Sequence, residues 1–331
     1  HRINRRQRQM CIRDRSDNAH KELQKICTAN IKNEAGKCVY THMLNPDGGI
    51  ETDLTVVCIE KDHFRIISSA ATRERDKFHI NKHLAKDVEL KDVTDDYCVF
   101  GVFGPKSRAL MKSISKDNFE NDNFRFSTAK YITIEGIKIW TQRLSYVGEL
   151  GYELYVKSKD AKKIYELLVN KGKDFNLSNC GMHAMDIMRM ESGFLHWGHD
   201  ISPEENQYQA GLTFTISSKK DDEFIGKKAL EKIKKEKIKS RFAMFTLKDS
   251  KPGEPLLLHD EPIYLENKII GRSTSGNYSF NFKKNLTFGY INNDISNDEL
   301  HKKDLFIEIE KKKYPIELIK KPLKQTNFKN N

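Results

Sequence analysis

The sequence has no apolar run that approaches the roughly 20 residues a helix needs to cross a bilayer, so no membrane partner is expected. Its six cysteines stand singly, and the absence of a Cys-x-x-Cys pair argues against a zinc ribbon or a thioredoxin-like site. We interpret them as reduced, mostly buried thiols in a reducing compartment, the cytoplasm or, in a eukaryote, the mitochondrial matrix. No strand–Gly-x-Gly-x-x-Gly–helix unit is found, so the sequence offers no site for a flavin.

The length and composition are those of a globular protein with a charged surface. The chain has 331 residues, which predicts two or three packed lobes. Hydrophobic residues make up 37% and charged residues 32% of it. The formal net charge of +11 raises the question of a nucleic-acid partner.

The first 15 residues differ in composition from everything that follows. They hold six arginines and one acid, whereas the rest of the chain holds nine arginines and 43 lysines. An arginine-rich nucleic-acid arm and a transit peptide are both open interpretations. We favour a third, a non-native segment that resembles translated sequencing-adapter sequence, and leave residues 1–15 out of the fold. About half of the net positive charge lies in this segment. Without it the chain is only modestly basic, so no nucleic-acid partner is expected. We also expect a natural chain that extends further toward its N-terminus.

The chain from residue 16 to 235 predicts mixed helices and strands. Two strands flank the turn sequence NPDGG at 45–49, and a second hairpin turns at Glu135-Gly136. Apolar residues at helical spacing predict five helices, over 17–29, 72–85, 104–114, 160–172 and 183–193, of which the fourth is expected to end at its glycine.

A change of composition near residue 231 predicts a separate domain over 236–325. Short β-branched and aromatic runs alternate there with turns of Gly, Asn and Asp, which indicates an all-β lobe, of which a barrel is one form. The fold class is therefore α+β, with a C-terminal β domain.

One carboxylate, Glu149, stands between Gly148 and Gly151 where two strand-like runs meet, in the stretch RLSYVGELGYELYV. Glycines let a planar ligand approach the backbone. Two carboxylate oxygens can accept parallel hydrogen bonds from an N–H/NH2 edge such as that of a 2-aminopyrimidinone, and Tyr146 and Tyr152 could add a stacking surface. From spacing alone, an exposed turn acid is the favoured interpretation.

Asp53 lies inside the apolar run GGIETDLTV. In a cleft it could act as a general base or hold a developing cation. Strand alternation offers another interpretation, in which Glu51, Asp53 and Thr55 share a solvent-facing side.

The stretch MRMESGFLHWGHD carries Arg189 near a helix end, where it could bind an anion or form a surface ion pair with Glu191. His196 and His199 have no clear third partner, so we expect no metal.

These stretches together resemble one family, the aminomethyltransferase (T protein) of the glycine cleavage system, and more closely the folate-binding C-terminal half of dimethylglycine and sarcosine dehydrogenases. The resemblance is carried in order by CVYTHMLNPDGGIETDLTV, SSAATRERD, VFGPKSRALM, SYVGELGYELYV, GMHAMDIMRMESGFLHWGHDISPEENQYQAGLTF, DEFIGKKAL and STSGNYSFNFKKNLTFGYI.

The resemblance implies a three-lobed aminomethyltransferase-like fold over residues 16–235, a β-barrel over 236–325, and tetrahydrofolate in a central channel. Asp53 would be catalytic as folate N5 and N10 capture a formaldehyde-level carbon to give 5,10-methylenetetrahydrofolate. Glu149 would bind the pterin edge. The other folate-binding residues implied are Tyr40, Ser69, Tyr146, Arg189 and Trp197.

Some positions depart from the T-protein pattern. Thr52 stands where the T protein usually has a second aspartate, and Ser69 where it has an asparagine. We therefore expect the C-terminal part of an FAD-dependent dehydrogenase, with FAD only in a missing N-terminal domain. Two alternatives stay open: a non-catalytic folate-binding protein of the iron–sulfur-assembly type, against which the missing cysteine after the long helix argues, and a stand-alone T protein.

Overall fold

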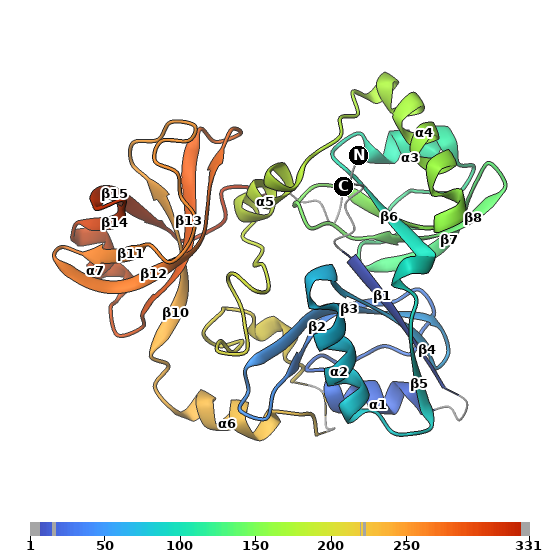
Figure 1. Cartoon of the computed structure of the whole chain (residues 1–331), viewed down its shortest axis with the longest axis horizontal. Helices are drawn as coiled ribbons and strands as arrows, with labels where there is room; N and C mark the ends of the chain where they lie inside the picture. The colour runs from blue at the N-terminus through green and yellow to red at the C-terminus, as the bar shows by residue number, and fades with distance from the viewer. Residues whose placement is uncertain (1–6, 15–17, 219, 221–222, 326–331) are drawn as a thin grey trace.

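The computed structural model describes residues 7–14, 18–218, 220 and 223–325 of the chain. Figure 1 shows three lobes, a barrel on one side and two sheets on the other, with helix α5 (Met182–Glu191) between the barrel and one of the sheets. Within these residues, no helix combines the length and apolarity that a membrane span requires.

The first lobe is an antiparallel sheet of five strands in the order β2-β3-β4-β1-β5. These strands are β1 (Gln7–Asp14), β2 (Cys38–Leu44), β3 (Ile50–Glu60), β4 (His63–Ser69) and β5 (Val88–Asp92). Helices α1 (Ala19–Ile26) and α2 (Arg73–His83) accompany it, with the short 3-10 helices η1 (Ala70–Thr72) and η2 (Thr94–Asp96). Its core is apolar and almost fully buried, and includes Leu23, Met43, Leu54, Phe64, Ile66 and Ile80.

Strand β1 comes from the arginine-rich segment that the sequence placed outside the fold. Its backbone pairs antiparallel with β4 from Gln7 to Arg13 and with β5 from Met10 to Asp14. Strand pairing uses main-chain groups, which every sequence supplies, and here it covers edges of β4 and β5 that would otherwise be open. The prediction that residues 1–15 are non-native therefore stays a prediction, because a backbone ladder does not depend on the origin of the segment.

The second lobe is a four-stranded antiparallel sheet in the order β6-β9-β8-β7. Its strands are β6 (Tyr97–Phe103), β7 (Thr128–Ile134), β8 (Ile137–Arg143) and β9 (Gly151–Lys157), packed with α3 (Ser107–Ile114) and α4 (Ala161–Gly172). The 3-10 helices η3 (Ser158–Asp160) and η4 (Lys173–Phe175) flank α4. The predicted hairpin turn is present, with positive φ at Glu135 (45°) and Gly136 (78°), as a type I′ turn requires.

Helix α4 ends at Gly172, as the sequence predicted. The φ of Gly172 is −64°, and the left-handed position falls on Asn176 (φ 59°) after η4. A Cβ on Gly172 would lie 2.4 Å from a methyl carbon of Leu177. The glycine is thus required by close packing rather than by a left-handed cap.

The third lobe is a closed barrel, strands β10-β13-β12-β11-β14-β15, which confirms the predicted C-terminal β-barrel. The strands are β10 (Ser240–Leu247), β11 (Pro262–Leu265), β12 (Lys268–Ser279), β13 (Lys284–Asn292), β14 (Leu305–Ile309) and β15 (Lys312–Ile319). Helix α7 (Asn297–Lys302) packs on it. Helix α6 (Lys227–Lys235) and the 3-10 helix η5 (Thr213–Thr215) lie on the segment leading into the barrel. The expected α+β class is confirmed.

Candidate functional site

Asp53 is placed by β3, directly opposite His42 on β2 in the antiparallel register. Its side chain is 19% exposed, and its Oδ1 has no hydrogen-bond partner. Burial raises the pKa of the Asp53 carboxyl from 3.8 to about 7, and the negative charge of Asp76 on α2 adds to the rise. This side of β3 is half-buried rather than solvent-facing, since Glu51 and Thr55 are half-buried too. A carboxyl group that titrates near pH 7 can both take up and release a proton.

An open aromatic surface lies beside this carboxyl. Tyr40, on the same side of β2 as His42, stacks on Phe214 of η5 with ring centroids 6.2 Å apart. Tyr40 is 39% exposed and Phe214 is 74% exposed, an unusual position for a large apolar ring. The exposed rings offer stacking area to a flat ligand within reach of the unpartnered Asp53 oxygen.

Tyr146 belongs to the β8–β9 loop, residues 144–150, and contacts the segment that follows α5. Its hydroxyl donates to the Leu195 carbonyl over 3.0 Å, and its ring stacks on Phe194 at 6.3 Å. Burial raises the pKa of Tyr146, and the Asp53 carboxylate adds to the rise. The structure therefore brings Asp53, Tyr40 and Tyr146 close together, whereas Tyr152 is fully buried in the core of the second lobe. A shared folate pocket stays a prediction.

Glu149 lies three residues further along the same loop, and its carboxylate already has a partner. Lys324, from the segment that follows β15, forms an ion pair with Glu149, whose side chain is 28% exposed. The backbone N–H of Lys324 donates to the Glu191 carbonyl over 2.8 Å, and its Nζ also donates to the Val147 carbonyl. The Lys324 ammonium is thus held by two protein groups, and its backbone by a third.

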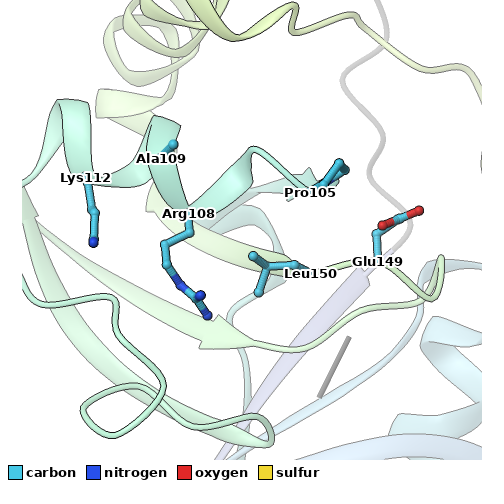
Figure 2. Close-up of a pocket in the computed structure, with 6 residues that line it drawn as sticks. All are labelled: Pro105, Arg108, Ala109, Lys112, Glu149 and Leu150. Carbon is cyan, nitrogen blue, oxygen red and sulfur yellow. The ribbon is translucent and has the colours of Figure 1, made fainter. Parts of the chain in front are cut away.

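A cavity of about 440 Å³ opens beside Glu149, along α3. Figure 2 shows its lining, in which the Glu149 carboxylate points away from Arg108 and Lys112. Arg108 donates to the Phe119 carbonyl and to Asn121, and Lys112 pairs with Glu120. The basic residues of this cavity therefore do not neutralise Glu149, whose counter-charge is Lys324.

The glycines around Glu149 are explained by contacts within the protein. A Cβ on Gly148, where φ is +65°, would lie 2.0 Å from Ser192 Oγ, and a Cβ on Gly151 would lie 2.1 Å from the Phe103 ring. The space we expected to admit a ligand next to the backbone is filled by these two side chains. The glycines let the loop dock against α5 and β6.

Ser69 ends β4 and caps η1, where its Oγ accepts weakly from the Ala71 N–H over 3.4 Å. The neighbouring Ser68 and Thr72 donate instead to Asp76, the buried acid that acts on Asp53. Ser69 thus holds the turn that presents Asp76. Its contact with a folate stays a prediction.

Arg189 is 1% exposed, so the surface ion pair with Glu191 is wrong. Its guanidinium donates to Asp186, to the Phe194 carbonyl, to Asp200 over 2.5 Å and to Ser275 over 2.7 Å. Glu191 turns instead to Ser279 and Asn281 of the barrel. Arg189 therefore ties α5 to the following loop and the barrel. Its direct contact with a folate stays a prediction.

Trp197 is partly buried. Its indole N–H donates to the Ile50 carbonyl over 3.0 Å, and the Arg75 guanidinium lies 4.3 Å above its ring. Arg75 in turn pairs with Glu51 over 2.6 Å. Trp197 thus fixes the start of β3, which carries Asp53, and one ring face is covered by Arg75.

Sequence reasoning missed His42, Phe214, Thr215 and Lys324. Strand alternation already put His42 on the same side of its strand as Tyr40, so this residue could have been found. The other three come from distant segments, and their approach is decided by the packing of the lobes. Within the described residues, no group of three or more His, Cys, Asp or Glu side chains could hold a metal ion.

Fold and site together define a three-lobed protein with a closed barrel and a half-buried carboxyl beside an open aromatic surface. Residues 15–220 match the family model of the GCVT N-terminal domain, and residues 241–324 match that of the glycine cleavage T-protein C-terminal barrel domain. The chain belongs to this aminomethyltransferase family, as the sequence resemblance indicated.

Two kinds of relative are similar to the chain. Mitochondrial dimethylglycine dehydrogenase of Homo sapiens is 32% identical over 92% of this chain but only 35% of its own length. An aminomethyltransferase of Halothermothrix orenii is 32% identical over 83% of this chain and 76% of its own length. The chain spans about a third of the length of the dehydrogenases that it matches.

A solved structure shares the fold. The crystal structure of the glycine cleavage system aminomethyltransferase T from Bartonella henselae superposes with a TM-score of 0.84, covering 98% of this chain and 85% of that one at 19% identity.

Proposed function

We propose that the protein binds tetrahydrofolate and transfers a formaldehyde-level carbon to its N5 and N10, forming 5,10-methylenetetrahydrofolate. One observation carries the proposal: a half-buried Asp53 whose Oδ1 has no partner, beside the exposed Tyr40–Phe214 stack. An unpartnered buried oxygen suits an N–H group of a ligand, and the stacked rings suit its flat heterocycle. Membership of the aminomethyltransferase family supports the assignment.

The chemistry requires proton movement at the position of Asp53. When an iminium CH2=NHR⁺ reacts, its carbon bonds to N5 and N10, each folate nitrogen loses one proton, and the amine leaves as RNH3⁺ with both. Asp53, with a pKa raised to about 7, gives a proton to the departing amine and takes one up from a folate N–H. Tyr40 and Phe214 hold the ring system, and Glu149 binds the aminopyrimidine edge once Lys324 has released it.

The donor of the one-carbon unit depends on the kind of protein to which the chain belongs. We infer that it is the C-terminal part of a dehydrogenase of the dimethylglycine or sarcosine type, in which a preceding FAD domain produces the iminium. Thr52, where the T protein usually has an aspartate, and the 32% identity to dimethylglycine dehydrogenase over 92% of this chain support this. A stand-alone aminomethyltransferase is the second candidate, supported by the coverage of 76% of the Halothermothrix orenii protein.

Comparison of Asp53→Ala with Glu60→Gln tests the function. Glu60 is an exposed acid at the other end of β3, so it is the control. We expect Asp53→Ala to lower the rate of methylene transfer from an amine–formaldehyde iminium on the order of 100-fold, because proton transfer is lost. Tetrahydrofolate binding, measured by calorimetry, should change by less than about threefold, a loss of under 1 kcal/mol. Transfer by the Asp53→Ala variant at the wild-type rate would show that Asp53 is not catalytic.

A further inference from the structure

His42 has no part in the function proposed above, yet it faces Asp53 directly. Its side chain is fully buried, and its Nε2 lies 3.6 Å from the unpartnered Oδ1 of Asp53. If Nε2 carried a hydrogen, it would face that oxygen as a donor. The position of the ring hydrogen, on Nδ1 or on Nε2, therefore decides whether Asp53 faces a hydrogen-bond donor or an acceptor.

The other side of the ring fixes this choice. His42 Nδ1 lies 3.0 Å from Thr215 Oγ1, and that hydroxyl donates its single proton to the Leu212 carbonyl over 2.7 Å. Thr215 Oγ1 can therefore only accept from His42, so the hydrogen is on Nδ1. Burial lowers the pKa of His42 to about 3, which leaves the ring neutral at physiological pH. Nε2 consequently presents a lone pair toward Asp53.

Tyr40 faces the same ring nitrogen. Its hydroxyl lies 3.3 Å from His42 Nε2. Because Nε2 can only accept, the Tyr40 proton points to His42, which leaves the Tyr40 oxygen with acceptor lone pairs only. The donors then run in one direction, from Tyr40 through His42 and Thr215 to the Leu212 carbonyl, and Asp53 Oδ1 lies 3.6 Å from the acceptor Nε2.

We propose that His42 and Thr215 are positioning residues that fix the direction of this hydrogen-bond chain and thereby hold a proton on Asp53. A chain that ends on a carbonyl cannot reverse without breaking a bond, and an Asp53 that faces only acceptors is satisfied when it carries its own hydrogen. This inference rests on the proposed function, because it assigns the resting protonation state of the catalytic acid.

The consequence for the transfer is a defined order of proton steps. Asp53 begins protonated, gives its proton to the departing amine nitrogen, and regains one from a folate N–H, so that its own proton count is unchanged at the end. His42 does not keep the proton, because its low pKa makes it a poor base. It orients the proton and does not contact the reacting atoms.

Other groups act on Asp53 independently of Thr215. Asp76 on α2 is an acid, Tyr146 on the β8–β9 loop interacts with Asp53 electrostatically, and Tyr40 lies on β2. A Thr215 substitution leaves all three side chains in place. Any change in the titration of Asp53 in such a variant therefore reports on the direction of the chain.

The test compares Thr215→Val with Thr215→Ser by NMR of aspartate labelled with ¹³C at the carboxyl carbon, with Asp53→Asn used to assign the signal. Valine removes the acceptor of the Nδ1 hydrogen, so the ring can move its hydrogen to Nε2 and donate to the carboxylate. We expect the titration midpoint of Asp53 to fall by about one pH unit or more in Thr215→Val. Serine keeps the hydroxyl and should keep the midpoint. If the titration midpoint of Asp53 in Thr215→Val equals that in the wild-type protein, the proposal is overturned.

A second measurement needs no variant. The ¹⁵N shifts of His42 in the wild-type protein at pH 7 should show Nδ1 protonated and Nε2 unprotonated, and the opposite tautomer would overturn the proposal even if Thr215→Val does not fold. In the transfer assay, the pH profile of kcat should shift for Thr215→Val while KM for tetrahydrofolate stays constant. The NMR titration does not require activity. A wild-type protein without transfer would therefore refute the proposed function and leave the result on His42 standing.

Discussion

Lys324, from the end of the chain, forms an ion pair with Glu149 in the β8–β9 loop, and the two side chains are 10% and 28% exposed. The carboxylate that the sequence singled out for ligand binding is therefore paired with a cation of the same chain. A ligand that uses the Glu149 carboxylate has to replace this contact or share it.

Removal of this cation should strengthen folate binding. In Lys324→Met the Glu149 carboxylate is free, so the ligand no longer displaces an ion pair. We expect the Kd for tetrahydrofolate, measured by calorimetry, to fall about fivefold, which corresponds to roughly 1 kcal/mol for a partly buried pair. Lys321→Met is the control, since Lys321 is an exposed lysine of the same segment. Unchanged or weaker binding in Lys324→Met would mean that Lys324 does not compete with the ligand.

Glu149→Gln should have the opposite effect. The amide keeps the shape but places a donor where the ligand edge needs an acceptor, a mismatch that costs about 1–3 kcal/mol. The expected result is a Kd for tetrahydrofolate raised about fivefold or more. Glu120→Gln, an exposed acid of the same lobe, serves as the control. If Glu149 mattered only as the partner of Lys324, both substitutions would shift the Kd in the same direction.

Asp53→Asn should stabilise the protein at alkaline pH. The folded-state pKa of Asp53 is raised from 3.8 to about 7, so the protonated form contributes stability at low pH, and that contribution is lost as the pH rises through 7. A pKa that differs by one between the folded and unfolded protein corresponds to about 1.36 kcal/mol, which makes the cost of the ionised side chain on the order of 4 kcal/mol at pH 8. We expect Tm of Asp53→Asn to exceed that of the wild type at pH 8 and to match it near pH 4. Asp260→Asn, at an exposed acid, should show no such gain, and equal Tm values for Asp53→Asn and the wild type at pH 8 would contradict the raised pKa.

Arg189→Met should destabilise the protein. The substitution leaves Asp200 fully buried without its cation, and breaking a buried pair in this way costs about 3–5 kcal/mol. Arg272→Met removes an exposed pair with Asp260 and should cost less than about 1 kcal/mol. Thermal unfolding of both variants measures the contrast. If Arg189→Met lowered Tm no more than Arg272→Met does, the buried contacts of Arg189 would not be important for stability.

Local patterns were enough to predict most of the fold. The NPDGG turn gave the β2–β3 hairpin, Glu135-Gly136 gave the β7–β8 hairpin, and the spacing of short strands after residue 236 gave the barrel. These features depend on neighbours in sequence, where turn chemistry and alternation act directly. The end of α4 at Gly172 was predicted too, but the packing of Leu177 that requires a glycine there is visible only in the structure.

The site was predictable only in part. By itself, the sequence determined that Asp53 lies on one of the two strands that flank the NPDGG turn and that Glu149 stands in a glycine-flanked loop, since hairpins and turns are local properties. The tertiary structure decided the rest: the pairing of Glu149 with Lys324, the burial of Arg189 against Asp200, and the Thr215 contact that sets the tautomer of His42. Those outcomes depend on desolvation and on contacts between segments far apart in the chain, and such quantities exist only once the lobes have packed together.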